Sequence, residues 1–206
     1  MRFLFGVLLL AGIATAQTGP FSHRVHLALK KQCTDCHAAA LTSASVEDNL
    51  LPPKEVCKPC HDSVTIPPPP RVAIAKFSHS QHLKLGNIAP VLAAAIKSKT
   101  YLSAPGDLGE RLNTKNPCEA CHRGMAESNA VTPDALPRMA DCLVCHSQID
   151  LPFSCETCHS KGANLKPANH TGDFIDVHSR KTAPLDRSTC AVCHGRRFTC
   201  MGCHSG

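Results

Sequence analysis

One five-residue pattern recurs seven times along the chain and uses every cysteine in it. Its form is Cys-x-x-Cys-His, and all 14 cysteines belong to it. The seven sets are Cys33, Cys36 and His37; Cys57, Cys60 and His61; Cys118, Cys121 and His122; Cys142, Cys145 and His146; Cys155, Cys158 and His159; Cys190, Cys193 and His194; and Cys200, Cys203 and His204. We number these sets motifs one to seven in chain order. Any fold of this chain must therefore accommodate seven such local units.

This spacing is the attachment signature of a c-type haem. Two thiols about one helical turn apart can form thioethers with the two vinyl groups of one porphyrin. The histidine that follows can then coordinate the iron as its proximal ligand. We predict seven covalently bound haem c groups.

Two structural alternatives use cysteine pairs as well. Zinc sites need thiolates in groups of four, and small exported proteins are often held by disulfides. Neither explains a histidine directly after every pair, and seven Cys-x-x-Cys bridges would be strained. The complete pairing therefore favours haem.

The first residues are typical of an export signal. Arg2 precedes an apolar run over residues 3–11, and Ala14-Thr15-Ala16 has the form of a signal-peptidase site. An uncleaved membrane anchor is the alternative, although the run is short for a transmembrane span and no second one follows. We expect a signal peptide over 1–16 and a mature chain from Gln17 in the periplasm or outside the cell.

Haem density decides the predicted fold class. The mature chain has 190 residues for seven haems, about 27 each, and the full sequence contains no Trp, one Tyr and seven Phe. The porphyrins must then supply most of the apolar surface that a core normally takes from side chains. We predict a mainly irregular chain with short α-helices and little or no β-sheet, wrapped in loops around a haem stack and largely unfolded without haem.

The formal charge of +6 does not indicate nucleic-acid binding. Seven haems bring 14 propionates, which make the holoprotein acidic, and the basic residues form no run. Lys and Arg are better interpreted as a solvated surface and as partners of propionates.

A second repeat supplies further histidines. Phe21-Ser22-His23 is followed by His26, and the same Phe-Ser-His-x-x-His phrase returns from Phe77, with histidines at 79 and 82. Histidines three residues apart share one face of a helical turn. Such pairs also occur by chance on surfaces or hold zinc, but in this chain we expect distal haem ligands.

The spacing of the motifs suggests three modules. We expect a two-haem module over 17–66, a three-haem module over 67–160 and a two-haem module over 161–206. Four prolines from Pro67 to Pro70 form a stiff boundary. The segment 84–117 is a haem-free insertion with a short helix near Pro90, and it could be a docking surface, a lid or a plain cover.

The histidine count leaves one iron short of a distal ligand. The chain has 13 histidines, and those outside the motifs are His23, His26, His79, His82, His170 and His178. Six distal histidines cannot serve seven irons, so we expect one haem to differ, most simply that of His146 or His159. Met139 or Met125 could bind there, a neighbouring subunit could supply a histidine, or the position could be open.

The Phe-Ser-His-x-x-His phrase ahead of a Cys-x-x-Cys-His motif resembles the class III multihaem cytochromes c, which are low-potential bis-histidine electron carriers. The resemblance covers residues 21–61 well, 77–160 in part and 170–206 only in general character. It implies that His23 serves the haem of motif one and His79 that of motif three. It also implies that His26 serves a haem further along, plausibly that of motif two.

These observations predict an electron-transfer protein rather than an enzyme. We expect redox partners: a quinol-oxidising or periplasmic donor upstream, and a reductase, outer-membrane conduit or extracellular acceptor downstream. A multihaem reductase of nitrite, hydroxylamine or peroxide is the alternative, and it would need one open haem. A homo-oligomer or a conductive filament is a third possibility.

Overall fold

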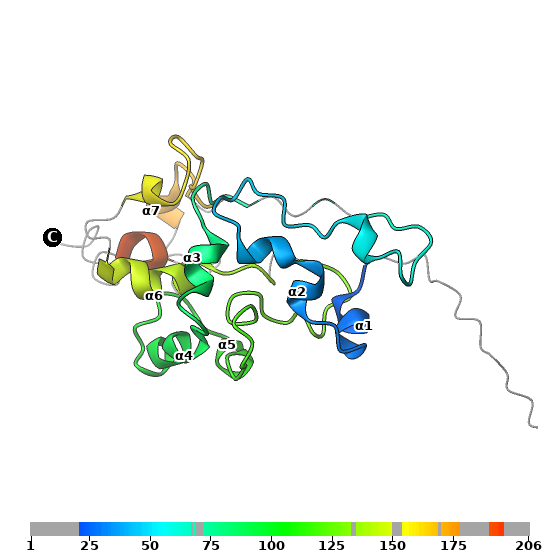
Figure 1. Ribbon diagram of the computed structural model, residues 1–206. Helices are drawn as coiled ribbons and strands as arrows, with labels where there is room; N and C mark the ends of the chain where they lie inside the picture. The colour runs from blue at the N-terminus through cyan, green and yellow to red at the C-terminus, as the bar shows by residue number, and fades with distance from the viewer. Residues whose placement is uncertain are drawn as a thin grey trace, which may run out of the picture.

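The computed structural model describes residues 21–66, 68, 72–132, 135–149, 154–168, 170–177 and 190–195 (Figure 1). Its helices are α1 His23–Ala28, α2 Cys33–Cys36, α3 His79–Leu83, α4 Ala89–Lys97, α5 Leu108–Arg111, α6 Met139–Ile149 and α7 Phe174–Val177, with 3-10 turns η1 Ala38–Leu41, η2 Lys54–Val56 and η4 Cys155–Thr157. A further helical turn covers 191–195. Within these ranges the only β-type pairing is an isolated bridge between Ile74 and His159. The prediction of a mainly irregular chain with short helices and little or no sheet is confirmed.

The repeated phrase forms the same capped helix twice. Ser22 Oγ accepts a hydrogen bond from the amide of Val25 at the start of α1, and Ser78 Oγ accepts one from the amide of Gln81 at the start of α3. A serine in this position satisfies a backbone N–H that has no partner within the helix. The serine of the phrase therefore begins each short helix at its first histidine.

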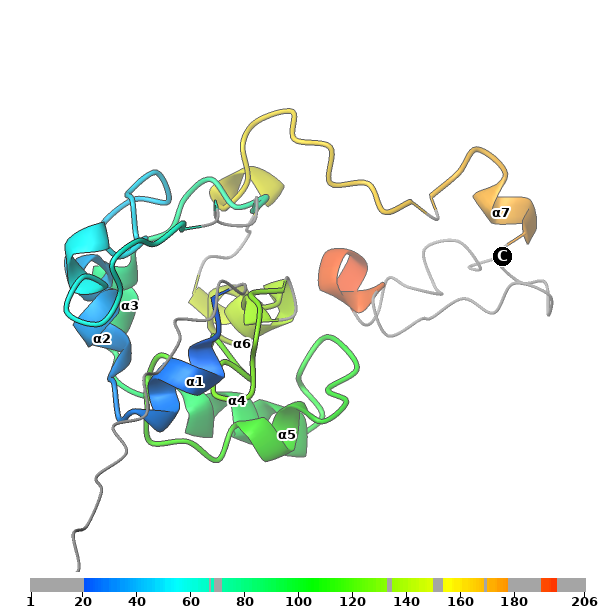
Figure 2. The same cartoon turned by 90° about the vertical axis from the view of Figure 1, so that its right-hand side faces the viewer.

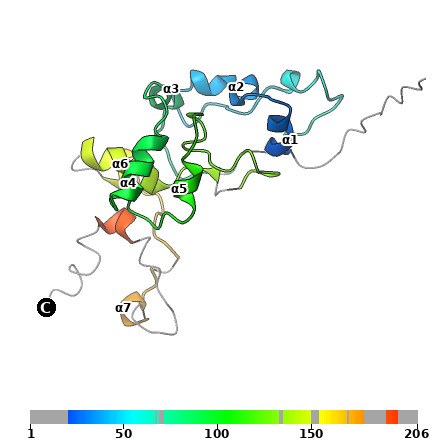
Figure 3. The same cartoon turned by 90° about the horizontal axis from the view of Figure 1, so that it is seen from below.

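The largest apolar cluster lies in the insertion and at the two motifs that follow it. It contains Ala89, Leu92, Ala95, Tyr101, Leu108, Leu112, Ala120 and Ala140. Pro90 lies in the first turn of α4, where its missing N–H costs no hydrogen bond. Helices α4, α5 and α6 lie close together in Figures 2 and 3, and α4 contacts α6. The segment 84–117 therefore packs against motifs three and four and forms a small conventional core with them.

Segments on either side of Pro67 to Pro70 contact one another. The Arg24 amide donates to the Ser128 carbonyl at 2.9 Å, and the Ser80 amide donates to the Ser43 carbonyl at 2.9 Å. Figures 1 and 3 both show the elements as an elongated arrangement with α1 and α2 toward one end and α6 toward the other. The module boundaries at 66 and 160 stay a prediction.

Some sequence predictions fall outside the described residues. They are the signal peptide over 1–16, the prolines at 67, 69 and 70, and His178, Cys200, Cys203 and His204. Among the helices that the structure describes, none has the length and apolar character needed to span a membrane.

Candidate haem sites

The histidines of the described residues come together in pairs. Each pair joins one histidine from outside the motifs to one motif histidine. Ring-centroid distances are 6.3 Å for His23 and His37, 6.1 Å for His26 and His61, 6.4 Å for His79 and His122, 6.2 Å for His82 and His146, and 6.1 Å for His170 and His194. Five of the seven motifs thus have a second imidazole opposite their own.

The spacing fits a metal between the two rings. A metal–imidazole bond is about 2.0–2.1 Å, and a ring nitrogen lies roughly 1.1 Å from its ring centre, so two coaxial ligands of one iron have centroids about 6.3 Å apart. All five pairs fall within 6.1–6.4 Å. Aromatic pairs in general spread over about 4.5–7 Å, so the narrow range is the informative feature.

The pairing follows one order in both histidine doublets, which are His23 with His26 and His79 with His82. The first histidine of a doublet faces the next motif along the chain, as His23 does with His37 and His79 with His122. The second histidine faces the motif after that, as His26 does with His61. His82 follows the same rule with His146.

Backbone carbonyls fix the orientation of several rings. The Nδ1–H of His26 donates to the Ser22 carbonyl at 2.8 Å, and the same bond joins His82 to Ser78 at 2.8 Å. Because a carbonyl only accepts, Nδ1 carries the proton and Nε2 keeps a free lone pair. Such a bond sets the tautomer and the direction of a metal-binding imidazole.

Three motif histidines are held in the same way. Their Nδ1–H groups donate to the carbonyls of Leu50 (from His37, 2.8 Å), Ala135 (from His122, 3.2 Å) and Ala73 (from His159, 2.9 Å). Each carbonyl lies at least 13 residues from its histidine. The loops between motifs therefore orient the motif histidines as well as joining the motifs.

The phenylalanine of the phrase packs on both histidines of its doublet. Phe21 stacks on His26 at a centroid distance of 4.6 Å and meets His23 edge-on at 4.8 Å. Phe77 repeats this geometry, with 4.4 Å to the second histidine and 4.8 Å to the first. One aromatic ring thus holds two imidazoles that point at different motifs.

The first histidine of each doublet is half-buried and neutral. Burial, followed by the nearby His37, lowers the pKa of His23, and burial, followed by His122, lowers that of His79. Their Nδ1 atoms are buried and meet no hydrogen-bond partner among the described residues. The neutral form is the one that binds a metal.

In the six motifs that the structure describes, a helical turn brings the first cysteine and the histidine together. The histidine amide donates to the carbonyl of the first cysteine four residues earlier at 2.8 Å in motif one, and the same bond recurs in motifs two, three, five and six. None of the 12 described cysteines forms a disulfide. Burial raises the pKa of Cys36, Cys118, Cys121 and Cys142, to about 11 for Cys142, so these groups are neutral thiols.

Thiols of different motifs lie near one another. Cys33 of motif one interacts with Cys118 of motif three and accepts a hydrogen bond from Asn116 Nδ2 at 3.4 Å. Cys36 of motif one is near Cys57 of motif two. The pKa of Cys36 is raised mainly by burial and next by this neighbouring thiol. Motif one thus has thiols near those of motif two and of motif three.

The same kind of proximity continues beyond motif three. The pKa of Cys142 in motif four is raised by burial and by the nearby Asp141, and then by Cys158 and Cys121, which belong to motifs five and three. The motifs therefore adjoin in the order two, one, three, four, five, which differs from their order in the sequence.

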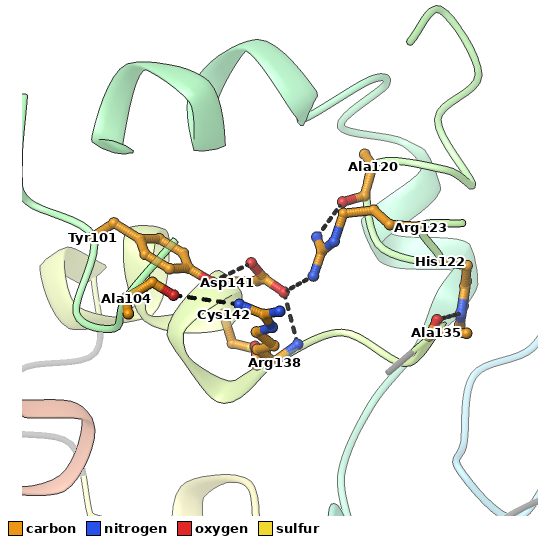
Figure 4. Close-up of polar contacts among 9 residues, drawn as sticks. All are labelled: Tyr101, Ala104, Ala120, His122, Arg123, Ala135, Arg138, Asp141 and Cys142. Atoms are coloured by element: carbon orange, nitrogen blue, oxygen red, sulfur yellow. Dashed lines mark hydrogen bonds and ion pairs between the residues drawn. The ribbon is translucent and has the colours of Figure 1, made fainter. Parts of the chain in front are cut away.

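A buried polar cluster joins motif three to motif four (Figure 4). Arg123, directly after His122, forms an ion pair with Asp141, directly before Cys142, at 2.5 Å, and both side chains are under 5 % exposed. The Tyr101 hydroxyl donates to the second carboxylate oxygen at 2.9 Å, and burial, followed by this carboxylate, raises the pKa of Tyr101. We name Tyr101, Arg123 and Asp141 the motif-linking cluster.

Other predicted residues remain without a partner of this kind. Met139 is the first residue of α6, which also contains His146. The ring that faces His146 belongs to His82, so a role of Met139 as an iron ligand stays a prediction. His159 faces no second imidazole among the described residues. Within the same part of the chain, no three His, Cys, Asp or Glu side chains gather in a way that would hold a bare metal ion.

The sequence predictions did not include the residues that hold the histidine rings in place or join motif three to motif four. Phe21 and Ser22 recur as Phe77 and Ser78, and this identity was a usable sign that the whole phrase has a structural role. The carbonyl of Ala73 and the motif-linking cluster carry no such sign, because each depends on residues far apart in the chain.

Comparisons with known proteins support the same assignment over one part of the chain. Neither the curated proteins nor the solved structures gave a significant match. A family model does match at the N-terminal doublet and the two motifs that follow it. Residues 20–69 are similar to the family described as cytochrome c7 and related cytochrome c, which associates this segment with the multihaem c-type cytochromes.

Proposed function

We propose that this protein is an exported heptahaem c-type cytochrome that carries electrons between redox partners. The observation that carries the proposal is the set of five imidazole pairs, each centred on one Cys-x-x-Cys-His motif and each spaced for one iron. Two histidines fill both axial positions of a haem iron and leave none for a substrate. Such centres suit electron transfer better than catalysis.

The residues of this chain would hold seven haems through the cysteine pairs and orient the axial ligands through backbone carbonyls. Bound haem iron supplies one-electron chemistry between its ferrous and ferric forms. The contacts of Phe21 and Phe77 and the carbonyl bonds restrict these rings, which would keep the reorganisation on electron transfer small.

Proximity of the motifs supports a continuous relay. Neighbouring thiols link the motifs in the order two, one, three, four, five. The motif-linking cluster fixes motif three against motif four through a buried ion pair. Electrons entering near motif two would thus pass motif one, then three and four, and reach motif five.

Partners follow from this role. We propose a quinol-oxidising or periplasmic donor and, downstream, a reductase or an outer-membrane or extracellular acceptor. Export by the segment 1–16 and assembly into oligomers or filaments belong to the same proposal.

The test is a redox titration of the purified protein with one ligand exchanged. In His79→Met one haem should rise in potential, since methionine ligation raises it relative to histidine, while the others stay nearly in place. Gln81→Met, an exposed change in the same helix, is the matched control. Titrations that are identical for His79→Met and the control would remove His79 from the ligand set.

A further inference from the structure

The histidine pairs leave two motifs, five and seven, that can lack a distal histidine. Five of the six histidines outside the motifs already face a motif histidine, and only His178 remains. Two motif histidines, His159 and His204, are not in these pairs. At least one of these two haems therefore has no distal histidine from its own chain.

The order of pairing selects between them. In both doublets the first histidine faces the next motif and the second faces the motif after it. His170 faces His194 of motif six, the next motif after it. The same order gives His178 to motif seven and leaves motif five without a histidine.

Motif five is nonetheless built as a haem site on its proximal side. The segment 72–76 lies along it: the amides of Ala75 and Lys76 donate to the Cys158 carbonyl at 2.8 and 3.1 Å. Lys76 Nζ donates to the Glu156 carbonyl at 3.0 Å. His159 is oriented by the Ala73 carbonyl 86 residues away. His159 thus has the same kind of carbonyl hydrogen bond as His37 and His122 in the paired sites.

We infer that the haem carried by Cys155 and Cys158, with His159 as proximal ligand, keeps an open sixth position that takes a small exogenous ligand. This inference rests on the proposed haem function. A five-coordinate ferrous haem binds neutral diatomic molecules such as carbon monoxide or nitric oxide, whereas bis-histidine haems do not without losing a ligand. Because Cys142 of motif four is near Cys158, this open haem would be the last of the relay described above and would receive electrons from motif four.

The experiment is a carbon monoxide titration of the reduced, monomeric holoprotein, with electron paramagnetic resonance of the oxidised form. Intact mass first counts the haems, so a failure of the proposed function shows as a haem deficit before any ligand is added. The inference predicts one bound carbon monoxide per seven haems and one high-spin centre. No binding and seven low-spin centres would overturn it.

Two double variants locate the site. Removing the haem of motif five with Cys155→Ala and Cys158→Ala should abolish both signals, while Cys200→Ala and Cys203→Ala, which remove that of motif seven, should preserve them. If one of these double variants cannot be produced with its remaining haems, the other still shows which motif carries the open haem. The opposite result would assign the open haem to motif seven and overturn the inference.

Met139→Ala tests whether this methionine, one of the two candidates from the sequence, binds the iron instead. Unchanged carbon monoxide binding and an unchanged high-spin signal support an open position at motif five. A low-spin centre in the parent that becomes high-spin in Met139→Ala would show that the methionine fills the site, which would also overturn the inference.

Discussion

The motif-linking cluster should dominate the mutational stability of the region around motifs three and four. Replacing Asp141 by Asn removes the negative charge but keeps the shape of the side chain. The Arg123 guanidinium, 4 % exposed, is then buried without a counter-charge. Breaking a buried ion pair by neutralising one partner costs about 3–5 kcal/mol.

Tyr101→Phe should cost less. It removes a 2.9 Å hydrogen bond to a charged group, but Asp141 keeps its ion pair with Arg123 and a bond from the Arg138 amide at 2.7 Å. Hydrogen bonds to charged groups contribute about 1.5–3 kcal/mol, and we expect the lower end. Because both changes affect one network, the double variant should lose less than the sum of the two.

The assay is guanidinium unfolding of the oxidised holoprotein, followed by far-ultraviolet circular dichroism and by haem absorbance. Covalent attachment keeps the haems on the chain during unfolding. Asp107→Asn is the matched control, because it neutralises the partner of Arg111 in an exposed pair and should leave the midpoint unchanged. An Asp141→Asn midpoint equal to that of this control would refute the reasoning.

Two more predictions concern pH and haem loss. The pKa of Tyr101 is raised in the folded protein, so its stabilising contribution is complete below the unfolded value of about 10 and declines as pH rises above it. The midpoint difference between the parent and Tyr101→Phe should thus stay constant up to about pH 9 and shrink as the pH rises from about 10 to about 11, and a difference that stays constant over the whole range would contradict the assigned burial. The chain produced without haem attachment should be largely unfolded by circular dichroism, because its apolar cluster is small, whereas native-like helix content would show that the polypeptide folds on its own.

The sequence could predict the fold class and the local units. Seven Cys-x-x-Cys-His motifs need only local turns, and the low aromatic content, with no Trp and one Tyr, argues against an extensive side-chain core. The structure describes short helices without a strand in its described ranges, as expected. Near Pro90 the expected short helix is present as α4, with its start at Ala89.

The role of the insertion could not be predicted because it depends on distant contacts. Tyr101 reaches Asp141 across 40 residues, and Arg123 reaches it across 18. In the sequence Arg123 and Asp141 look like ordinary surface charges, and only their burial distinguishes them. The same reason hides the Ala73 carbonyl that orients His159.

The order of the motifs in the sequence also does not predict that motif one lies near motif three. Motif two follows motif one along the chain, yet Cys33 lies beside Cys118 and Asn116. A short connection would suggest that consecutive motifs alone are neighbours. The long segment between motifs two and three instead returns the chain to motif one.

The most direct measurement for the account is the intact mass of the exported protein, combined with alkylation of free thiols. If each cysteine pair holds one haem, the mass exceeds that of the chain from Gln17 by seven haem groups, and none of the 14 cysteines reacts. A mass with fewer haems and reactive cysteines in the remaining motifs, or a mass that carries zinc, would contradict it.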